Sequence, residues 1–169
     1  ARCLQDAGLS LDFWIYHTQL SEMEKIAMTL PELSIILNHI GGPIHLGEYE
    51  GKQALTHREW RRAMMRLSRL PNIKVKLGGL GMEVNGAKFH LNQNPPNSSQ
   101  LADIWKSWIY ETIDMFGVER CMFESNFPVD KQSVSYHVLW NFFKKISENF
   151  SEDEKYSMFY DCAKKAYSL

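Results

Sequence analysis

Short apolar segments alternate with longer amphipathic segments along most of this chain. The apolar segments are rich in β-branched and aromatic residues, which is typical of buried strands, and they are Leu11–His17, Ser34–His39, Ile73–Gly78 and Arg120–Ser125. After each of them, apolar side chains recur at i, i+3 and i+4, which predicts helices beginning near residues 21, 56, 98, 133 and 151. Four strand–helix units in a row predict a parallel sheet with right-handed crossovers.

Helix starts are marked by the S/T-x-x-E spacing of a capping box, in which the first side chain and the third following side chain bond each other's backbone. Three pairs have this spacing: Ser21 with Glu24, Thr56 with Glu59, and Ser151 with Glu154. The links from strand to helix are long at residues 40–55 and 79–97, whereas the links from helix back to strand are short. Long loops at the carboxyl ends of parallel strands usually bind ligands, so the site is expected there.

Polar residues inside the strands distinguish two architectures. Lys74 and Lys76 share one face of the third strand, and Glu124 and Asn126 share one face of the fourth. Helices on both faces of a small doubly wound sheet would bury these groups at a high cost, whereas a barrel interior that opens into a site accommodates them. The pattern favours an α/β fold of parallel (βα) units that form half of a TIM (βα)8 barrel, which needs about 250 residues when complete.

The composition of the chain limits the kinds of partner that it is expected to bind. The chain has 19 Lys plus Arg against 20 Asp plus Glu, a balance that lacks the basic excess of a nucleic-acid binder. Its apolar runs are shorter than the roughly 18 residues of a membrane span. Cys3, Cys121 and Cys162 are scattered without metal-site spacing, which is typical of a reducing, cytoplasmic protein. A small-molecule ligand is therefore expected, with neither nucleic acid nor membrane as a partner.

Two histidines end the first two predicted strands in the same position. His17 and His39 are expected at the mouth of a barrel, near enough to share a metal ion or a substrate. The alternative is that each bonds a carbonyl group of its own loop. Gly41 and Gly42 follow His39 after one intervening residue, and they let the backbone approach a ligand closely or simply turn.

The end of the fourth strand carries the remaining candidate groups. We expect Lys76 and Glu124 to form a buried ion pair on neighbouring strands that also adjusts the site and contacts substrate. Asn126 and Asp130 follow Glu124 and are candidate catalytic residues. The alternative for Asn126 is that it bonds its own turn.

Several motifs together resemble a known family. They run through the chain in the order Asp12-Phe13-Trp14, LNHIGGP (37–43), KLGGLGM (76–82), CMFESNFPVDK (121–131) and SYHVLW (135–140). This set is similar to the amidohydrolase-2 (amidohydrolase-related) family of TIM-barrel hydrolases, in its lactonase-like branch. The resemblance implies that residues 1–169 are the C-terminal half of such a domain, with strands five to eight and the closing helix.

The family site combines an HxH pair on strand one with one histidine on strand five, one on strand six and an aspartate on strand eight. The resemblance places His17 at the strand-five position and His39 at the strand-six position, which implies that they bind a divalent metal such as zinc or manganese. The aspartate position falls on Asn126, and this sequence has no HxH. Because an amide cannot accept a proton near neutral pH, the base must be another group, with Asp130 or a histidine of the missing half as candidates.

The resemblance implies a hydrolase in which water attacks a lactone or a related cyclic ester of a small organic acid or sugar acid. His17 and His39 would bind the carbonyl group or the metal, and Asn126 would donate to the oxyanion. A decarboxylase of the same family is one alternative, and a truncated, non-catalytic fragment or pseudoenzyme is another. An unclosed sheet would also expose its edge strands, so an oligomer is possible. Because this chain has no HxH pair, the isolated chain is expected to be inactive.

Overall fold

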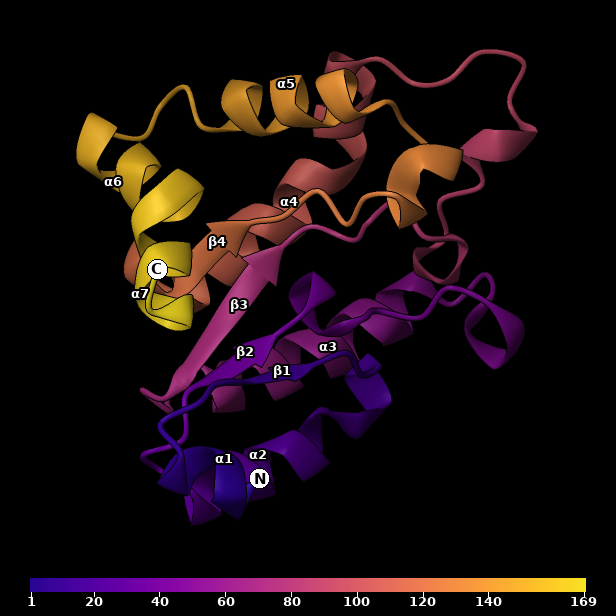
Figure 1. The fold of residues 1–169 in the computed structure, drawn as a ribbon. Helices are drawn as coiled ribbons and strands as arrows, with labels where there is room; N and C mark the ends of the chain where they lie inside the picture. Colours follow the sequence, from indigo (N-terminus) through magenta and orange to yellow (C-terminus); the bar gives the residue numbers. More distant parts are fainter.

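A computed structural model describes residues 1–169 as an α/β unit with one four-stranded parallel sheet (Figure 1). The strands lie side by side in chain order: β1 (Leu11–Phe13), β2 (Ile35–Leu37), β3 (Ile73–Leu77) and β4 (Cys121–Phe123). All three pairings are parallel. The predicted order of four (βα) units is therefore confirmed, and the sheet ends at β1 and β4 without closing.

Helices connect the strands and continue past the sheet. They are α1 (Arg2–Asp6), α2 (Leu20–Thr29), α3 (Gln53–Leu67), α4 (Ser98–Phe116), α5 (Tyr136–Ile146), α6 (Glu152–Tyr156) and α7 (Cys162–Tyr167). A π-helical segment, Ser157–Asp161, joins α6 to α7. No helix combines the length and apolarity needed to cross a bilayer.

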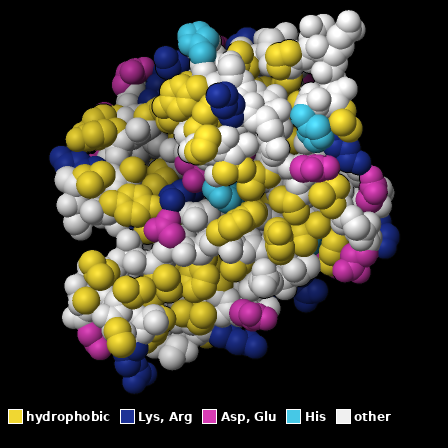
Figure 2. Space-filling model, turned by 45° about the vertical axis from the view of Figure 1, so that its right-hand side comes forward, with side chains coloured by type: hydrophobic (Ala, Val, Ile, Leu, Met, Phe, Trp, Pro, Cys, Tyr) yellow, Lys and Arg dark blue, Asp and Glu magenta, His cyan; other side chains and the backbone are white.

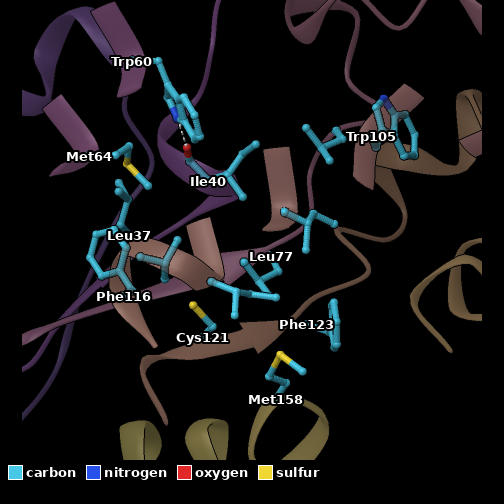
Figure 3. Packing of buried hydrophobic residues seen from close by; sticks show 14 of the residues in the cluster. Leu37, Ile40, Trp60, Met64, Leu77, Trp105, Phe116, Cys121, Phe123 and Met158 are labelled. Carbon is cyan, nitrogen blue, oxygen red and sulfur yellow. Dashed lines mark hydrogen bonds between the residues drawn. The ribbon is translucent and has the colours of Figure 1, made fainter. Parts of the chain in front are cut away.

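The outer face of the sheet forms the core. This cluster contains 31 buried residues, which come from the strands, from the loops and from α2, α3, α4 and α5, and burial of their apolar surface is the main force that stabilises the fold. Figure 3 shows Leu37, Leu77 and Cys121 of three strands among helix side chains. In the same view, the Trp60 indole N–H donates to the carbonyl oxygen of Ile40 over 2.6 Å, which ties α3 to the loop after β2.

The inner face of the sheet is partly polar, as the sequence predicted. Ile36 and Met122 pack against Cys162 and Ala166, so α7 lies across this face. Beside them, Lys76 Nζ contacts Asp12 Oδ1 at 2.6 Å, and the Tyr167 hydroxyl donates to the same carboxylate oxygen over 2.8 Å. Figure 2 shows one side of the molecule, where hydrophobic side chains surround a small central group of charged and histidine side chains.

The expected ion pair between Lys76 and Glu124 is wrong. Lys76 instead pairs with Asp12 of β1, two strands away, and Glu124 contacts His39. The inner side chains of β1 and β3 meet across β2, which presents only the apolar Ile36 between them. Alternation along a strand predicts the face on which a side chain lies but not which neighbour on that face it reaches.

Of the three expected capping boxes, only Ser151 with Glu154 is present. Helix α2 already begins at Leu20. Helix α3 begins at Gln53, so Thr56 lies inside its first turn, where its hydroxyl donates to the carbonyl oxygen of Ile44. A tertiary hydrogen bond from a fully buried threonine thus replaces the local cap.

Candidate active site

The candidate site lies where three neighbouring strands end. The chain leaves β2 at Asn38–His39, β3 at Gly78–Gly81 and β4 at Glu124–Asn126. Because the strands are parallel and adjacent, these three segments meet at one edge of the sheet. The structure therefore brings together His39, Glu124, Asn126 and Asp130, the cluster that we call the strand-end cluster.

His39 and Glu124 form the central contact of this cluster. Glu124 Oε1 accepts the backbone N–H of His39 over 3.0 Å and also contacts Nδ1 of its ring. An ionised carboxylate only accepts hydrogen bonds, so Nδ1 carries the proton and Nε2 is left to exchange a proton with a ligand. The His39 side chain is 10% exposed and that of Glu124 is 15% exposed, which leaves the pair accessible from one side.

The backbone at His39 has an unusual conformation that fixes this geometry. His39 and Ile40 have φ values of +56° and +48°, and Gly41 and Gly42 also have positive φ. A left-handed conformation is strained for a β-branched residue such as Ile40 and persists only where the surroundings hold it. The hydrogen bond from Trp60 to Ile40 and the two contacts of Glu124 supply that support.

Asp130 is the most buried acid of the site. Its exposed fraction is 0%, Oδ2 accepts the N–H of Gly81 over 3.1 Å, and Oδ1 accepts the side-chain amide of Asn126 over 2.8 Å. Burial raises the pKa of Asp130 to about 6, although the hydrogen bonds from Asn126 and Gly81 oppose that rise. Since solvent does not reach Asp130, it positions Asn126 and the loop after β3 and does not itself contact a ligand.

The buried charge of Asp130 leads to a stability prediction. Its pKa rises from 3.8 unfolded to about 6 folded, so the folded chain binds more protons between these values and stability falls as pH rises through this range. That shift corresponds to about 3 kcal/mol. Asp130→Asn removes the charge, and Asn126 can turn its amide to accept from the new side chain. In urea unfolding experiments, we expect the free energy of unfolding of the variant to increase relative to that of the parent as pH rises from about 4 to about 7. A pH-independent difference would contradict the assignment.

Three glycines after β3 make room for the cluster. A Cβ on Gly78 would lie 2.3 Å from the Glu124 carbonyl oxygen, and one on Gly79 would lie 2.4 Å from the ring of His39. A Cβ on Gly81 would lie 2.8 Å from the Asp130 carboxyl carbon. In the sequence analysis this glycine run served only as one of the family motifs. Three glycines within four residues at a strand end were nevertheless a usable signal for close backbone approach.

His17 lies in a different environment from the strand-end cluster. Its ring is buried, Nδ1 accepts the N–H of Ile44 over 3.3 Å, and Nε2 lies 3.7 Å from Glu59 Oε2. Burial lowers the pKa of His17, although the Glu59 carboxylate opposes this. These contacts hold the loop after β2 to the end of β1; the ring of His17 accepts a loop N–H, whereas the alternative expected it to bond a loop carbonyl group.

The space beside Gly41 and Gly42 is also filled by other parts of the chain. A Cβ on Gly42 would lie 2.4 Å from the carbonyl oxygen of Ile15, and one on Gly41 would lie 3.1 Å from the Met64 sulfur. Both glycines are buried. Their lack of a side chain therefore serves the close packing of the loop against β1 and α3. Lys76, another expected substrate contact, lies in its ion pair with Asp12 on the inner face of the sheet.

A parallel sheet with polar side chains at its strand ends is the arrangement that barrel-type α/β proteins use for their sites. The comparisons with known proteins give the family: residues 1–169 match the Amidohydrolase family (Amidohydro_2) over their full length. The chain belongs to this family, and the expected resemblance is confirmed.

Two curated relatives extend this result. The chain is 38% identical to an uncharacterised protein, y4mH, of Sinorhizobium fredii, over 96% of this chain and 48% of the relative. It is 25% identical to L-fucono-1,5-lactonase of Burkholderia multivorans, over 98% of this chain and 53% of that enzyme. The chain therefore spans about half the length of the curated relatives it matches.

Solved structures confirm the fold. A crystal structure of an amidohydrolase from Burkholderia multivorans with bound zinc has a TM-score of 0.81 at 26% identity, covering 98% of this chain and 55% of that one. An amidohydrolase of Bifidobacterium longum subsp. infantis has a TM-score of 0.65 at 23% identity, covering 99% and 53%. Four parallel strands with their helices thus correspond to about half of a TIM-barrel amidohydrolase.

The zinc of the Burkholderia structure prompts the question of whether this chain holds a metal. Nδ1 of His39 is bonded to Glu124, both oxygens of Asp130 accept hydrogen bonds, and Nε2 of His17 faces Glu59. No three His, Cys, Asp or Glu side chains are grouped so that they could hold a metal ion. Nε2 of His17 is nevertheless buried without a hydrogen-bond partner, so it remains free to bind a ligand, and the sharing of a metal ion by His17 and His39 stays a prediction.

Proposed function

We propose that the protein hydrolyses a lactone or a related cyclic ester of a small organic acid or sugar acid. The accessible His39–Glu124 pair carries this proposal, because it supplies a proton-transfer group at the ligand-binding edge of the sheet. The likeness to an L-fucono-1,5-lactonase supports the substrate class. We further propose that the four strands are strands five to eight of a barrel whose other half completes the walls of the site.

In the proposed reaction, His39 acts first as a base and then as an acid. Nε2 takes a proton from water while the water oxygen bonds to the ester carbonyl carbon, and the Glu124 carboxylate stabilises the imidazolium. When the tetrahedral intermediate collapses, the bond from that carbon to the ring oxygen breaks, and Nε2 returns the proton to the leaving oxygen. The product is the open hydroxy acid, and His39 is neutral again.

Asn126 is the proposed oxyanion donor. Its side-chain amide has two N–H groups, and one of them donates to Asp130. The other is available to the carbonyl oxygen as negative charge develops there, which is the role in which a fixed donor contributes most. At the position of Asn126, the family that the sequence resembles has an aspartate, so this role uses an amide in place of a carboxylate.

The proposal is tested with a panel of aldono-1,4- and aldono-1,5-lactones and the purified full-length protein, in which the other half of the barrel is present, with product acid followed by a pH indicator. We expect hydrolysis of at least one lactone, and we expect His39→Ala to lose about 10²- to 10⁴-fold in kcat/KM. The matched control is His90→Ala, which changes an exposed histidine of the loop after β3 and should leave the rate unchanged. Absence of hydrolysis across the panel, or equal rates in parent and His39→Ala, would favour a non-catalytic protein.

A further inference from the structure

A groove follows the face of α3 that points away from the sheet. It has a volume of about 540 Å³, and arginines make up most of its lining: Arg58, Arg61, Arg62, Arg66 and Arg69. The chain as a whole has a formal net charge of −1, so this concentration of positive charge is local. Because like charges one helical turn apart repel each other, the arrangement opposes the stability of α3 and needs another explanation.

Carboxylates from the two neighbouring helices neutralise part of this charge. Arg61 Nε donates to Glu111 Oε2 of α4 over 3.1 Å, and Arg66 Nε donates to Glu24 Oε2 of α2 over 2.8 Å. His57 Nε2 lies 2.8 Å from the other carboxylate oxygen of Glu111. Since α2 and α4 already flank the groove, the other half of the proposed barrel, which adjoins β1 and β4, leaves it open.

The remaining arginines form a line between the two ion pairs. Arg58, Arg62 and Arg69 are exposed and pair with no carboxylate, and Met65, which is 40% exposed, lies among them in the groove. We call these four residues the arginine stripe. Their spacing of four, three and four residues places them on one side of the helix, along about 16 Å of its axis. Ser68 keeps a helical conformation, so the line continues to Arg69 past the end of α3.

We propose that the arginine stripe binds an extended acidic segment of a partner protein. A guanidinium group binds a carboxylate through two parallel hydrogen bonds, which an exposed arginine without a partner is free to form. Every second side chain of an extended segment points to the same side, with a repeat of about 7 Å. Arg58 and Arg62 lie about 6 Å apart along the helix axis. Met65 supplies an apolar contact for a side chain between the acidic ones.

The narrowness of the positive charge favours a peptide over a nucleic acid. Glu24 and Glu111 border the arginine stripe on its two sides. A duplex presents phosphates over a wide surface, so it would meet these carboxylates, and the chain lacks the basic excess that offsets such repulsion. A single extended peptide contacts only the central line. None of the strand-end cluster lines the groove, so this binding is independent of the proposed function.

The test measures fluorescence anisotropy of a labelled synthetic peptide, with alternating glutamates and a central leucine, on titration with the purified full-length protein. We expect saturable binding that weakens as salt is raised, because the contacts are between exposed charges. Arg58→Gln and Arg62→Gln should each weaken binding about three- to tenfold, and the double variant more than either. Lys144→Gln is the matched control, because it removes an exposed cation of α5 and should leave the affinity unchanged.

The same titrations contain the results that would overturn the proposal. They are no binding of the acidic peptide, unchanged affinity in the double variant, or tighter binding of a labelled oligothymidylate than of the peptide. Thermal unfolding checks that the double variant is folded, and we expect no loss of stability, since repulsion along α3 is relieved. His39→Ala should bind the peptide as the parent does. Because no lactone is present in this assay, failure of the proposed hydrolysis would leave its outcome unaffected.

Discussion

Glu124→Gln is expected to lower the turnover number for lactone hydrolysis by about 10²- to 10⁴-fold with little change in stability. The substitution keeps the size of the side chain. The backbone N–H of His39 donates to the oxygen at this position, so the glutamine must place its amide oxygen there and cannot turn its NH₂ group inward. The tautomer of His39 is therefore retained, and only the negative charge that stabilises its imidazolium is lost.

Steady-state kinetics and thermal unfolding of the same preparations check this prediction. Glu124→Ala is the comparison variant, because it removes the acceptor as well as the charge and leaves the ring of His39 free to rotate. It should lose activity and also stability, by about 1–3 kcal/mol, since a buried donor becomes unsatisfied. Parental turnover in Glu124→Gln would show that the carboxylate has no part in proton transfer.

Gly79→Ala is expected to be strongly destabilising and to abolish activity. Gly79 has a φ of +68°, where a side chain costs about 1–2 kcal/mol, and its Cβ would lie 2.4 Å from the ring of His39. Relief of that overlap costs a further 1–3 kcal/mol, roughly, and moves the ring away from Glu124. Urea unfolding should show the sum of both effects, and lactone hydrolysis should be lost with the ring position.

Gly47→Ala separates the two contributions. Gly47 also has a positive φ, +58°, but a Cβ there would meet nothing within 4 Å. Its alanine variant should therefore show only the backbone effect of about 1–2 kcal/mol and should keep its activity. Equal destabilisation of the two variants would mean that the space beside His39 is not needed.

Much of the fold could be predicted from the sequence because it depends on local patterns. The alternation of apolar segments and amphipathic helices predicts four parallel units, and the long loops after β2 and β3 predict the edge at which the site lies. Strand ends were less well predicted. His17 and His39 were placed inside strands, but the chain turns into short 3-10 segments at both residues.

The pairing of side chains within the site could not be predicted in the same way. Glu124 lies beside His39 because β2 and β4 both flank β3 and the glycine run after β3 leaves space between their ends. Sequence spacing contains no information on such a contact between residues 85 positions apart. The burial of Asp130 is equally a property of the folded loop, since it depends on the N–H of Gly81 and the amide of Asn126.

The hydrogen bond between Tyr167 and Asp12 has a consequence for synthesis on the ribosome. These residues are 155 positions apart, and at about 5–20 residues per second the ribosome needs roughly 8–30 seconds to make the chain between them. During that time Asp12 has left the exit tunnel, but α7, which covers the inner face of the sheet, does not yet exist. Until α7 is made, a sheet that has already formed leaves Ile36 and Met122 uncovered on its inner face.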